Sequence, residues 1–454
     1  MYRKIIDKLK NKNVAILGFG MEGKSTYRFI RKYLNNQNIT IIDKNDILKN
    51  NYELLKDDNN INYVIGDNYL SNLDKYDIII KSPGISFKDI NISNIKTKIT
   101  SQLELLLEVD KENVIGVTGT KGKSTTSSLI YQVLKDQNYK TYLLGNIGNP
   151  IFDEIEKYDN DTKLVIEMSS HQLEFIKVSP HVGIILNLFE DHLDHAGSVK
   201  HYHECKMHMF DYQNSDDIAI YSKDNESLNN YILNNKYKST LHSVSLSSDA
   251  SINIKNDYVY FENEKLYNIN DKRNLLGNHN LSNIMFVLLV VKLLKLDLNK
   301  AINTINEFKT LKHRLEYVGE FNKIKYYDDA IATIPAATIN AVKALENVNT
   351  LIFGGMDRGI EYESLIEFLK DSNIDNLICM PTTGYNIGEK LKDTNKNIYF
   401  IESLDDAVKK AKEVTKKQSI CLLSPAAASY EYFKNFEEKG NYFQKLVKKT
   451  NCDK

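Results

Sequence analysis

Cysteine is scarce in this chain, and its spacing excludes two kinds of small structural domain. The four cysteines among the 454 residues stand far apart and form no Cys-x-x-Cys pair. Neither a disulfide framework nor a cysteine zinc knuckle is therefore expected. An excess of charge of one sign is also lacking, because the formal net charge is −1. Proteins that bind the phosphate backbone of nucleic acids carry a clear basic excess, so nucleic acid is not expected as a partner.

Long hydrophobic runs are missing as well. The longest apolar stretch, residues 284–296, is interrupted by Lys292 and Lys295, is too short to span a bilayer, and predicts a buried helix. Residues 1–12 alternate in charge and contain no apolar segment, so no secretory signal is expected. A cytoplasmic protein without a membrane partner follows as the expectation. The apolar content of 42% and the charged content of 26% are typical of a soluble enzyme.

Short β-branched runs recur along the chain, each followed by a helical pattern. They cover residues 13–18, 39–43, 63–67 and 76–81, then 114–118, 141–144, 164–167 and 182–187, then 325–329, 350–353, 377–380, 398–402 and 420–423. Strands that alternate with helices predict an α/β fold with parallel sheets covered by helices, and the length suits about three domains.

The three series of strands place the expected domains at residues 1–98, 99–310 and 311–454. In parallel sheets, ligands bind beyond the carboxyl ends of the strands, and the unusual residues of all three series stand there. Two Asn- and Lys-rich stretches, residues 49–62 and 225–238, are expected to be exposed loops.

The second series opens with the most informative segment. Residues 114–118 form a strand-like run, residues 119–124 read Gly-Thr-Lys-Gly-Lys-Ser, and a helical pattern follows. A strand, a glycine loop, Lys-Ser and a helix together cradle the phosphates of a nucleotide. Lys123 is expected at the outer phosphates and the Ser124 hydroxyl at Mg²⁺. Val117 stands where the full pattern has its first glycine, so a tight turn without a ligand remains the alternative.

The first series contains a Gly-x-Gly-x-x-Gly loop at residues 18–23, and Asp43 ends the next strand. This spacing fits a dinucleotide site in which Asp43 reaches a ribose hydroxyl. The same turn can hold any diphosphate, so the ligand stays open at this point. The turn Ser82, Pro83 and Gly84 is a second strand-end loop that suits a phosphate or a sugar.

Further polar residues follow strands of the second and third series. Glu167 ends a strand close to the nucleotide loop, where a carboxylate can hold Mg²⁺. His192 lies between two acids, and the histidines of this region show no zinc spacing. In the third series, Arg314 can steady phosphate charge. Asp357 and Arg358 stand together on a glycine turn, which suits a zwitterion such as an amino acid.

The order of these motifs resembles that of the Mur ligase family, the ATP-dependent amino-acid ligases of peptidoglycan precursor synthesis. The resemblance covers nearly the whole chain. Its motifs are residues 119–124, residues 145–148, Glu167 with the serines after it, residues 187–192, Lys206, residues 277–280 with Asn283, His313 with Arg314, and Asp329 with Thr333. Segments 18–25, 100–104 and 424–440 are most similar to the D-glutamate-adding branch of the family.

The resemblance implies a Rossmann-like UDP-binding domain, a central P-loop ATPase-like domain and a C-terminal Rossmann-like α/β domain. The implied UDP-sugar residues are Gly18, Phe19, Gly20, Met21, Gly23, Lys24, Ser25, Asp43, Ser82, Pro83 and Gly84. The implied ATP residues are Gly119, Thr120, Lys121, Gly122, Lys123, Ser124, Thr125, Asn280, Asn283, Arg314 and Asp329. The implied D-glutamate residues are Asp357, Arg358, Ser429, Tyr430 and Phe436.

The catalytic residues implied by the resemblance are Lys123, Asn146, Glu167, His192 and Lys206. Two Mg²⁺ ions would bind Ser124, Glu167, His192 and a carbamylated Lys206. The small-molecule substrates would be ATP, UDP-N-acetylmuramoyl-L-alanine and D-glutamate, and the expected state is a monomer. The implied reaction passes through an acyl phosphate, and domain closure would shield it from water.

One departure bears on the amino acid. Many relatives carry Ser-Lys after the acid of the third domain, whereas Ala330 and Ile331 follow Asp329 here. The positive charge of that lysine must come from elsewhere, for example from Arg358. Two alternatives stay open: another Mur-type or folylpolyglutamate synthase-like amino-acid ligase, and an NAD-dependent oxidoreductase that uses the first domain. A non-catalytic protein with a decayed site is disfavoured by the intact Lys123, Glu167 and Lys206.

Overall fold

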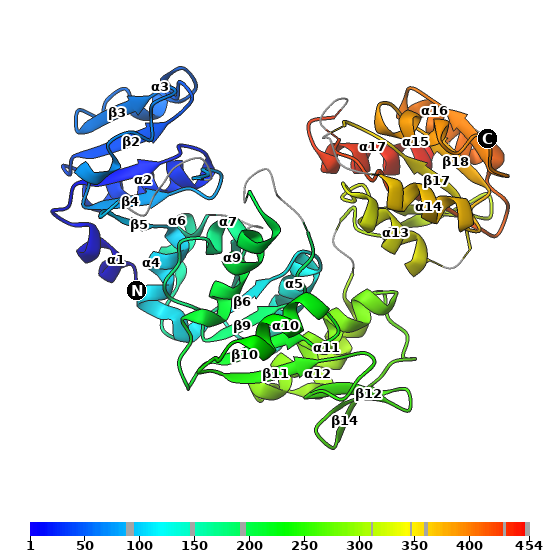
Figure 1. The fold of residues 1–454 in the computed structure, drawn as a ribbon, viewed down its shortest axis with the longest axis horizontal. Helices are drawn as coiled ribbons and strands as arrows, with labels where there is room; N and C mark the ends of the chain where they lie inside the picture. The colour runs from blue at the N-terminus through cyan, green and yellow to red at the C-terminus, as the bar shows by residue number, and fades with distance from the viewer. Residues whose placement is uncertain are drawn as a thin grey trace. The chain divides into compact units, whose positions relative to one another are not determined.

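Three helix-covered sheets build the protein in this computed structural model (Figure 1). The structure describes residues 1–87, 95–145, 150–190, 197–309, 312–345, 347–357, 362–429 and 433–449. The described part of the chain contains no helix long and apolar enough to cross a membrane. The sequence prediction of an α/β fold with three parallel-dominated sheets is confirmed.

The first sheet is fully parallel, with strand order β3-β2-β1-β4-β5. Its strands are β1 (Val14–Leu17), β2 (Ile39–Asp43), β3 (Ile61–Ile65), β4 (Ile78–Lys81) and β5 (Lys98–Thr100). The helical elements around them are α1 (Tyr2–Leu9), α2 (Met21–Tyr33), α3 (Leu48–Leu55) and η1 (Leu73–Lys75). The direction of strand addition reverses between β1 and β4, which is where such sheets bind ligands.

The second sheet has nine strands in the order β14-β13-β12-β11-β10-β9-β6-β8-β7, and β12 to β14 form an antiparallel extension. Its strands are β6 (Val114–Thr118), β7 (Thr141–Gly145), β8 (Lys163–Glu167), β9 (Val182–Ile185), β10 (Ile218–Ser222), β11 (Thr240–Val244), β12 (Ile252–Lys255), β13 (Tyr258–Phe261) and β14 (Glu264–Asn268). The accompanying helical elements are α4 (Gln102–Asp110), η3 (Lys111–Asn113), α5 (Lys123–Asp136), α6 (Ile151–Glu154), η4 (Ile155–Lys157), α7 (Ser170–Leu173), α9 (Val199–Asp211), α10 (Glu226–Asn234), α11 (Asn278–Leu293) and α12 (Leu298–Glu307).

The third sheet has the order β15-β16-β20-β17-β18-β19, and only its edge strand β15 is antiparallel. Its strands are β15 (Glu316–Phe321), β16 (Ile324–Asp328), β17 (Val348–Phe353), β18 (Asn376–Cys379), β19 (Asn397–Phe400) and β20 (Ile420–Leu423). Its helices are α13 (Pro335–Ala344), α14 (Glu363–Asp371), α15 (Thr383–Glu389), α16 (Leu404–Val414) and α17 (Phe436–Lys448).

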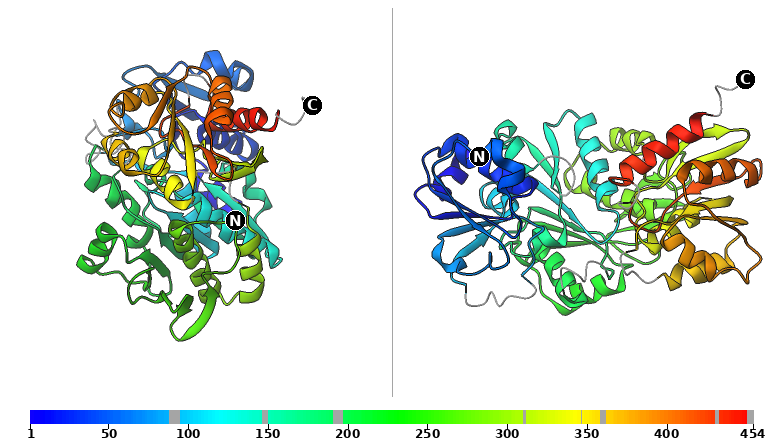
Figure 2. Two further views of the ribbon diagram at one scale, coloured as in Figure 1. Left: turned by 90° about the vertical axis from the view of Figure 1, so that its right-hand side faces the viewer. Right: turned by 90° about the horizontal axis from the view of Figure 1, so that it is seen from above.

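Side chains of the third sheet alternate between two cores, because successive residues of a strand point to opposite faces. Leu351 and Phe353 pack in the core under α13, α14 and α15. Ile352, between them in β17, packs in the core under α16 and α17. Helices therefore cover both faces of this sheet (Figure 2), and only the strand ends remain for a ligand.

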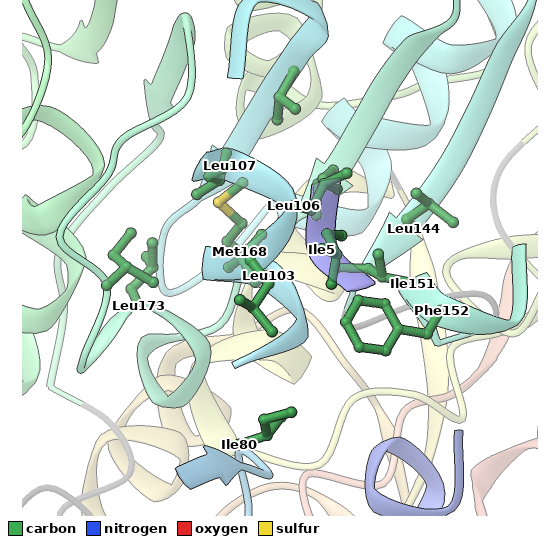
Figure 3. Close-up of a cluster of buried hydrophobic side chains, with 14 of the residues drawn as sticks. Ile5, Ile80, Leu103, Leu106, Leu107, Leu144, Ile151, Phe152, Met168 and Leu173 are labelled. Atoms are coloured by element: carbon green, nitrogen blue, oxygen red, sulfur yellow. The ribbon is translucent and has the colours of Figure 1, made fainter. Parts of the chain in front are cut away.

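The chain separates into two compact units. The first comprises residues 1–271 and 282–306, and the second comprises residues 272–281 and 307–454. One apolar core joins the first two sheets within the first unit. Figure 3 shows Ile5 of α1 and Ile80 of β4 in the same cluster as Leu106 of α4 and Leu144 of β7. This shared core explains why the first two sheets form one unit.

All thirteen strands predicted from the sequence are present, with ends shifted by up to two residues. The buried helix predicted at residues 284–296 is confirmed as part of α11, whose residues from Ile284 to Val291 are at most 1% exposed. The prediction of exposed loops at residues 49–62 and 225–238 is wrong, because α3 and α10 occupy much of these stretches. Helix α10 starts with an N-cap in which the Asn225 side chain accepts a hydrogen bond from Leu228 N.

Candidate functional site

The Gly-x-Gly-x-x-Gly loop lies at the switch point of the first sheet, between β1 and β4. Gly18 follows β1 with φ +87°, a conformation that favours glycine. The Ser82 hydroxyl, just after β4, donates a 2.8 Å hydrogen bond to the Gly18 carbonyl. The loops that follow the two strands are thereby joined at the edge where a ligand would bind.

The glycines of this loop have two different tasks. A Cβ on Gly23 would lie 2.1 Å from the Gly18 carbonyl oxygen, so this position must be glycine for α2 to pack on the loop. A Cβ on Gly20 or on Gly84 would meet nothing within 4 Å. Helix α2 starts after Gly20 without a side-chain cap, so its first backbone N–H groups suit an anion. Of the other residues assigned to this site, Met21 is exposed and Ser25 is buried.

Asp43 shapes this loop. Its carboxylate is buried, accepting 2.7 Å from Phe19 N through Oδ2 and 2.9 Å from Asn45 N through Oδ1. Both carboxylate oxygens of Asp43 therefore already accept hydrogen bonds from backbone N–H groups. A contact between Asp43 and the uridine end of a ligand stays a prediction.

The phosphate loop follows the central strand β6. Gly119 and Gly122 have φ values of +151° and +84°, and α5 begins at Lys123 with no side-chain cap. The Lys123 ammonium lies back over the loop and donates to the carbonyls of Gly119 at 2.9 Å and Thr120 at 3.0 Å. A strand, a left-handed glycine and an uncapped helix start form an anion site.

Asn187 fixes the shape of the phosphate loop, although the sequence analysis assigned it no role of its own. Its Oδ1 accepts hydrogen bonds from Thr120 N at 3.0 Å and Lys121 N at 2.8 Å, and its Nδ2 donates to Lys121 O at 3.0 Å. The Thr120 hydroxyl also exchanges hydrogen bonds with the backbone of Phe189. The sequence feature that could have indicated this role is the position of Asn187. It stands two residues after the end of β9, and β9 pairs with β6, the strand before the phosphate loop.

Glu167 and Lys206 come to the same edge of the second sheet. Glu167 ends β8 and pairs in register with Val117 of β6, and it is 1% exposed. Lys206, on α9, is also 1% exposed, and its ammonium donates a 3.1 Å hydrogen bond to the Gly119 carbonyl. The Tyr202 ring centroid lies 4.7 Å from that ammonium. The cations of Lys123 and Lys206 therefore share one carbonyl oxygen.

Asn283 approaches the same loop from α11. A Cβ on Gly122 would lie 2.6 Å from Asn283 Oδ1, so the glycine leaves room for this side chain. Asn280 donates to the Leu276 carbonyl at 2.8 Å. Ser124 stands in the first turn of α5, next to the buried Thr125. The Ser124 hydroxyl and the Glu167 carboxylate offer the oxygen donors that Mg²⁺ prefers.

Four residues assigned from the sequence lie outside the described residues. They are Asn146, His192, Arg358 and Tyr430.

Asp329 follows β16 and is held among hydrogen-bond donors. The Ser424 hydroxyl donates to Oδ2 at 2.7 Å, and Leu315 N donates to Oδ1 at 3.2 Å. Burial raises the pKa of Asp329 to about 7, against the opposing effects of the Ser424 hydrogen bond and of the Arg314 charge. The structure thus brings Asp329 within reach of the Arg314 charge inside the second unit, and a contact of either residue with ATP stays a prediction.

A buried pair, His313 and Asp328, lies next to Asp329. His313 Nδ1 lies 2.7 Å from Asp328 Oδ2, and both side chains are at most 2% exposed. Burial disfavours the imidazolium, but the hydrogen bond and charge of Asp328 outweigh it and raise the pKa of His313. A Cβ on Gly440 of α17 would lie 2.1 Å from His313 Nδ1, so this helix turn also requires glycine.

Among the described residues, two clusters of three acidic and histidine side chains have a geometry that could hold a cation. They are Glu112 with His181 and Asp217, and His313 with Glu316 and Asp328. Neither contains Ser124 or Glu167. Asp217 is already ion-paired with Lys111 at 2.6 Å, which counts against a metal there.

The glycine turn after β17 meets the segment after β20. Gly354 N donates to Pro425 O at 2.8 Å, and Met356 N donates to Ala428 O at 2.9 Å. Ser429 stands next, and its hydroxyl is buried with no hydrogen-bond partner among the described residues. Asp357 is exposed, and Phe436 begins α17 with its ring 6.4 Å from the His313 ring. Asp357 and Ser429 of the predicted amino-acid group each directly follow a residue of the Met356–Ala428 backbone bridge.

Three family models match the chain in succession. The Mur ligase MurD-like N-terminal domain matches residues 12–101, the Mur ligase middle domain matches residues 117–291, and the Mur ligase glutamate ligase domain matches residues 313–427.

Curated relatives match along the whole chain. A UDP-N-acetylmuramoylalanine–D-glutamate ligase of Clostridium botulinum (strain Loch Maree) is 33% identical over 98% of both chains. The protein of the same name from Clostridium kluyveri is 33% identical over 97% of both chains.

Solved structures share the fold. The MurF ligase of Thermotoga maritima in complex with ADP has a TM-score of 0.60 and 17% identity, and it covers 91% of this chain and 96% of its own. The FolC structure of E. coli in complex with ADP has a TM-score of 0.54 and 16% identity, covering 77% of this chain and 92% of its own. At these identities the likeness concerns the fold alone.

The two glycines of the first loop give a matched pair of variants. Gly23→Ala should destabilise the protein by about 3 kcal/mol or more, because its Cβ would overlap the Gly18 carbonyl. Gly20→Ala should cost no more than about 1 kcal/mol but weaken binding of UDP, because its Cβ would enter the open side of the loop. Thermal unfolding and UDP calorimetry measure both effects. Equal unfolding temperatures for the two variants would contradict the packing role of Gly23.

Asp329→Asn should stabilise the protein more at pH 8 than at pH 5. The folded-state pKa of Asp329, about 7, lies above the ordinary value of 3.8. The native state therefore binds its proton more tightly than the unfolded state, and this group's contribution to stability falls as the pH rises through 7. Asparagine does not titrate, so the stability advantage of Asp329→Asn over wild type should grow by on the order of 2 kcal/mol between the two pH values.

Urea unfolding at pH 5 and pH 8 measures this difference. The Asp393→Asn variant, changed at an exposed residue, is the control. An advantage independent of pH would be evidence against a raised pKa.

Proposed function

The chain belongs to the Mur ligase family, and from this premise we propose that it is an ATP-dependent ligase that adds D-glutamate to UDP-N-acetylmuramoyl-L-alanine. The observation that carries the proposal is the match, along nearly the full chain, to curated relatives named for this reaction. The product would be a precursor of peptidoglycan, made in the cytoplasm by a monomer.

ATP would bind the loop between β6 and α5. In the proposed reaction the L-alanine carboxylate attacks the γ-phosphorus of ATP and ADP leaves. The amine of D-glutamate then attacks the acyl phosphate, loses a proton and displaces phosphate. Lys123 and the uncapped start of α5 would hold the phosphates and oppose the charge that develops on them. Mg²⁺, when bound, would neutralise phosphate charge, and the oxygen donors of Ser124 and Glu167 suit it.

The UDP part would bind at the switch point of the first sheet. Support comes from the free space over Gly20 and Gly84 and from the uncapped start of α2. The match of residues 12–101 to an N-terminal Mur ligase model favours this assignment over a nicotinamide dinucleotide. That match and the named relatives also favour this ligase over a folylpolyglutamate synthase-like enzyme.

The remaining assignments are part of the same proposal. Arg314, Asp329, Asn280 and Asn283 would serve ATP, and Asp357, Ser429 and Phe436 would serve D-glutamate, with domain limits at residues 98 and 310. His192 and Lys206 would complete the donors for two Mg²⁺ ions. An uncharged Lys206 amine would add CO₂ and release a proton, which converts a cation into an anion with two oxygen donors.

The proposed activity is tested by ATP-dependent phosphate release in the presence of UDP-N-acetylmuramoyl-L-alanine. D-Glutamate should stimulate release strongly, whereas L-glutamate, L-lysine and glycine should leave it near the background rate. Asn187→Ala, which loses its hydrogen bonds to the phosphate loop, should raise the KM for ATP about tenfold or more. No stimulation by D-glutamate would refute the proposed function.

Carbamylation of Lys206 predicts a specific rescue pattern. Lys206→Ala should lose at least about a hundredfold in kcat, because the buried position would hold no donor in place of the carbamate. Short carboxylic acids or added chloride should restore part of the rate of this variant. Full activity of Lys206→Ala without any additive would exclude the carbamate.

A further inference from the structure

Lys439 is a buried cation that the assignments above leave without a task. It lies in the first turns of α17 and is 2% exposed. Its ammonium donates a 2.9 Å hydrogen bond to the carbonyl of Gly354. Burial lowers the pKa of Lys439 to about 8, and no carboxylate of a described residue contributes to that shift. A charge held away from water without an ionic partner is costly, and such groups concentrate at functional sites.

The position of this cation links it to the strand ends of the third sheet. Gly354 begins the turn after β17, and a Cβ on the next residue, Gly355, would lie only 2.4 Å from the Ala428 carbonyl oxygen. The segment after β20 therefore packs directly on this turn. Ser429 follows Ala428, and its buried hydroxyl has no hydrogen-bond partner among the described residues. Among the described residues, the Lys439 ammonium therefore bonds only the Gly354 carbonyl and the Ser429 hydroxyl has no partner, and both groups lie beside the same turn.

Within the function proposed above, we propose that Lys439 supplies the positive charge that attracts a carboxylate of the incoming amino acid to this turn. Ala330 and Ile331 follow Asp329, so no cationic side chain stands directly after that acid. The Ser429 hydroxyl is the neighbouring donor for the same carboxylate.

A purely structural role makes the opposite prediction for stability. If Lys439 only latched the Gly354 carbonyl, its replacement by methionine would lower the unfolding temperature. If it is an unpaired charge kept for an anion, methionine should leave the unfolding temperature unchanged or raise it, since burying an apolar chain costs less than burying a lone charge. Binding of the amino acid should weaken in that variant all the same.

The test compares Lys439→Met, Lys439→Gln and Lys439→Arg in the phosphate-release assay. Met and Gln remove the charge, and Gln keeps a donor for Gly354. Both should raise the KM for D-glutamate about tenfold to a hundredfold, with the KM for ATP unchanged and kcat changed less than about threefold. Arg should stay within a few-fold of wild type. Lys412→Met is the matched control, because Lys412 of α16 also donates to a backbone carbonyl, that of Leu446 at 2.9 Å.

The outcomes separate the two proposals. A wild-type enzyme that ignores D-glutamate would refute the function and this inference together. An active wild type with an unchanged KM for D-glutamate in Lys439→Met, or in Lys439→Gln should the methionine variant fail to fold, would refute the inference alone. A rise in KM that Lys412→Met shares would also refute it, since a general effect on the domain would then suffice.

Discussion

The parallel sheet with helices on both faces is the constraint on which the rest of this structure depends. In the third sheet, alternate residues of β17 enter two separate cores, one under α13 to α15 and one under α16 and α17. No face of such a sheet is left for a ligand, so binding chemistry can stand only where strands end. The loops after β1, β4, β6, β8, β16, β17 and β20 accordingly carry many of the polar residues assigned to the site, whereas Lys206 and Asn283 come from helices α9 and α11.

Close approach of backbone at these strand ends explains the glycines better than flexibility does. Gly23 and Gly354 leave no room for a Cβ, against the Gly18 carbonyl oxygen in one case and the Met380 carbonyl oxygen in the other. Gly20 and Gly84 have open space instead. The same residue type therefore either packs the site or leaves it accessible, and only three-dimensional structure separates the two uses.

Much of the fold could be read from the sequence because parallel strands form continuous apolar runs and turn residues mark their ends. The strands that went unrecognised, such as β12 to β14, form an antiparallel extension with half-exposed residues and weak apolar signal. Helix α10 was missed because its Asn-rich, polar composition resembles that of a loop, although Asn225 caps it and Leu228 is buried.

In the candidate site, the phosphate loop could be predicted from the local spacing of its residues. The roles of Asn187 and Lys439 depend on contacts with residues 66 and 85 positions away, which one sequence does not reveal.

Each of the two units contains buried or half-buried charged groups at its strand ends. In the first unit, the ammonium groups of Lys123 and Lys206 both donate to the Gly119 carbonyl, so two cationic side chains stand at one loop. In the second unit, burial disfavours the charged forms of both Asp329 and Lys439. Each of these groups has its charge opposed by desolvation and would be favoured by a partner of opposite sign. Asp329 already has the Arg314 charge and the Ser424 hydroxyl beside it, whereas for Lys439 the carboxylate of the proposed amino-acid substrate would be that partner.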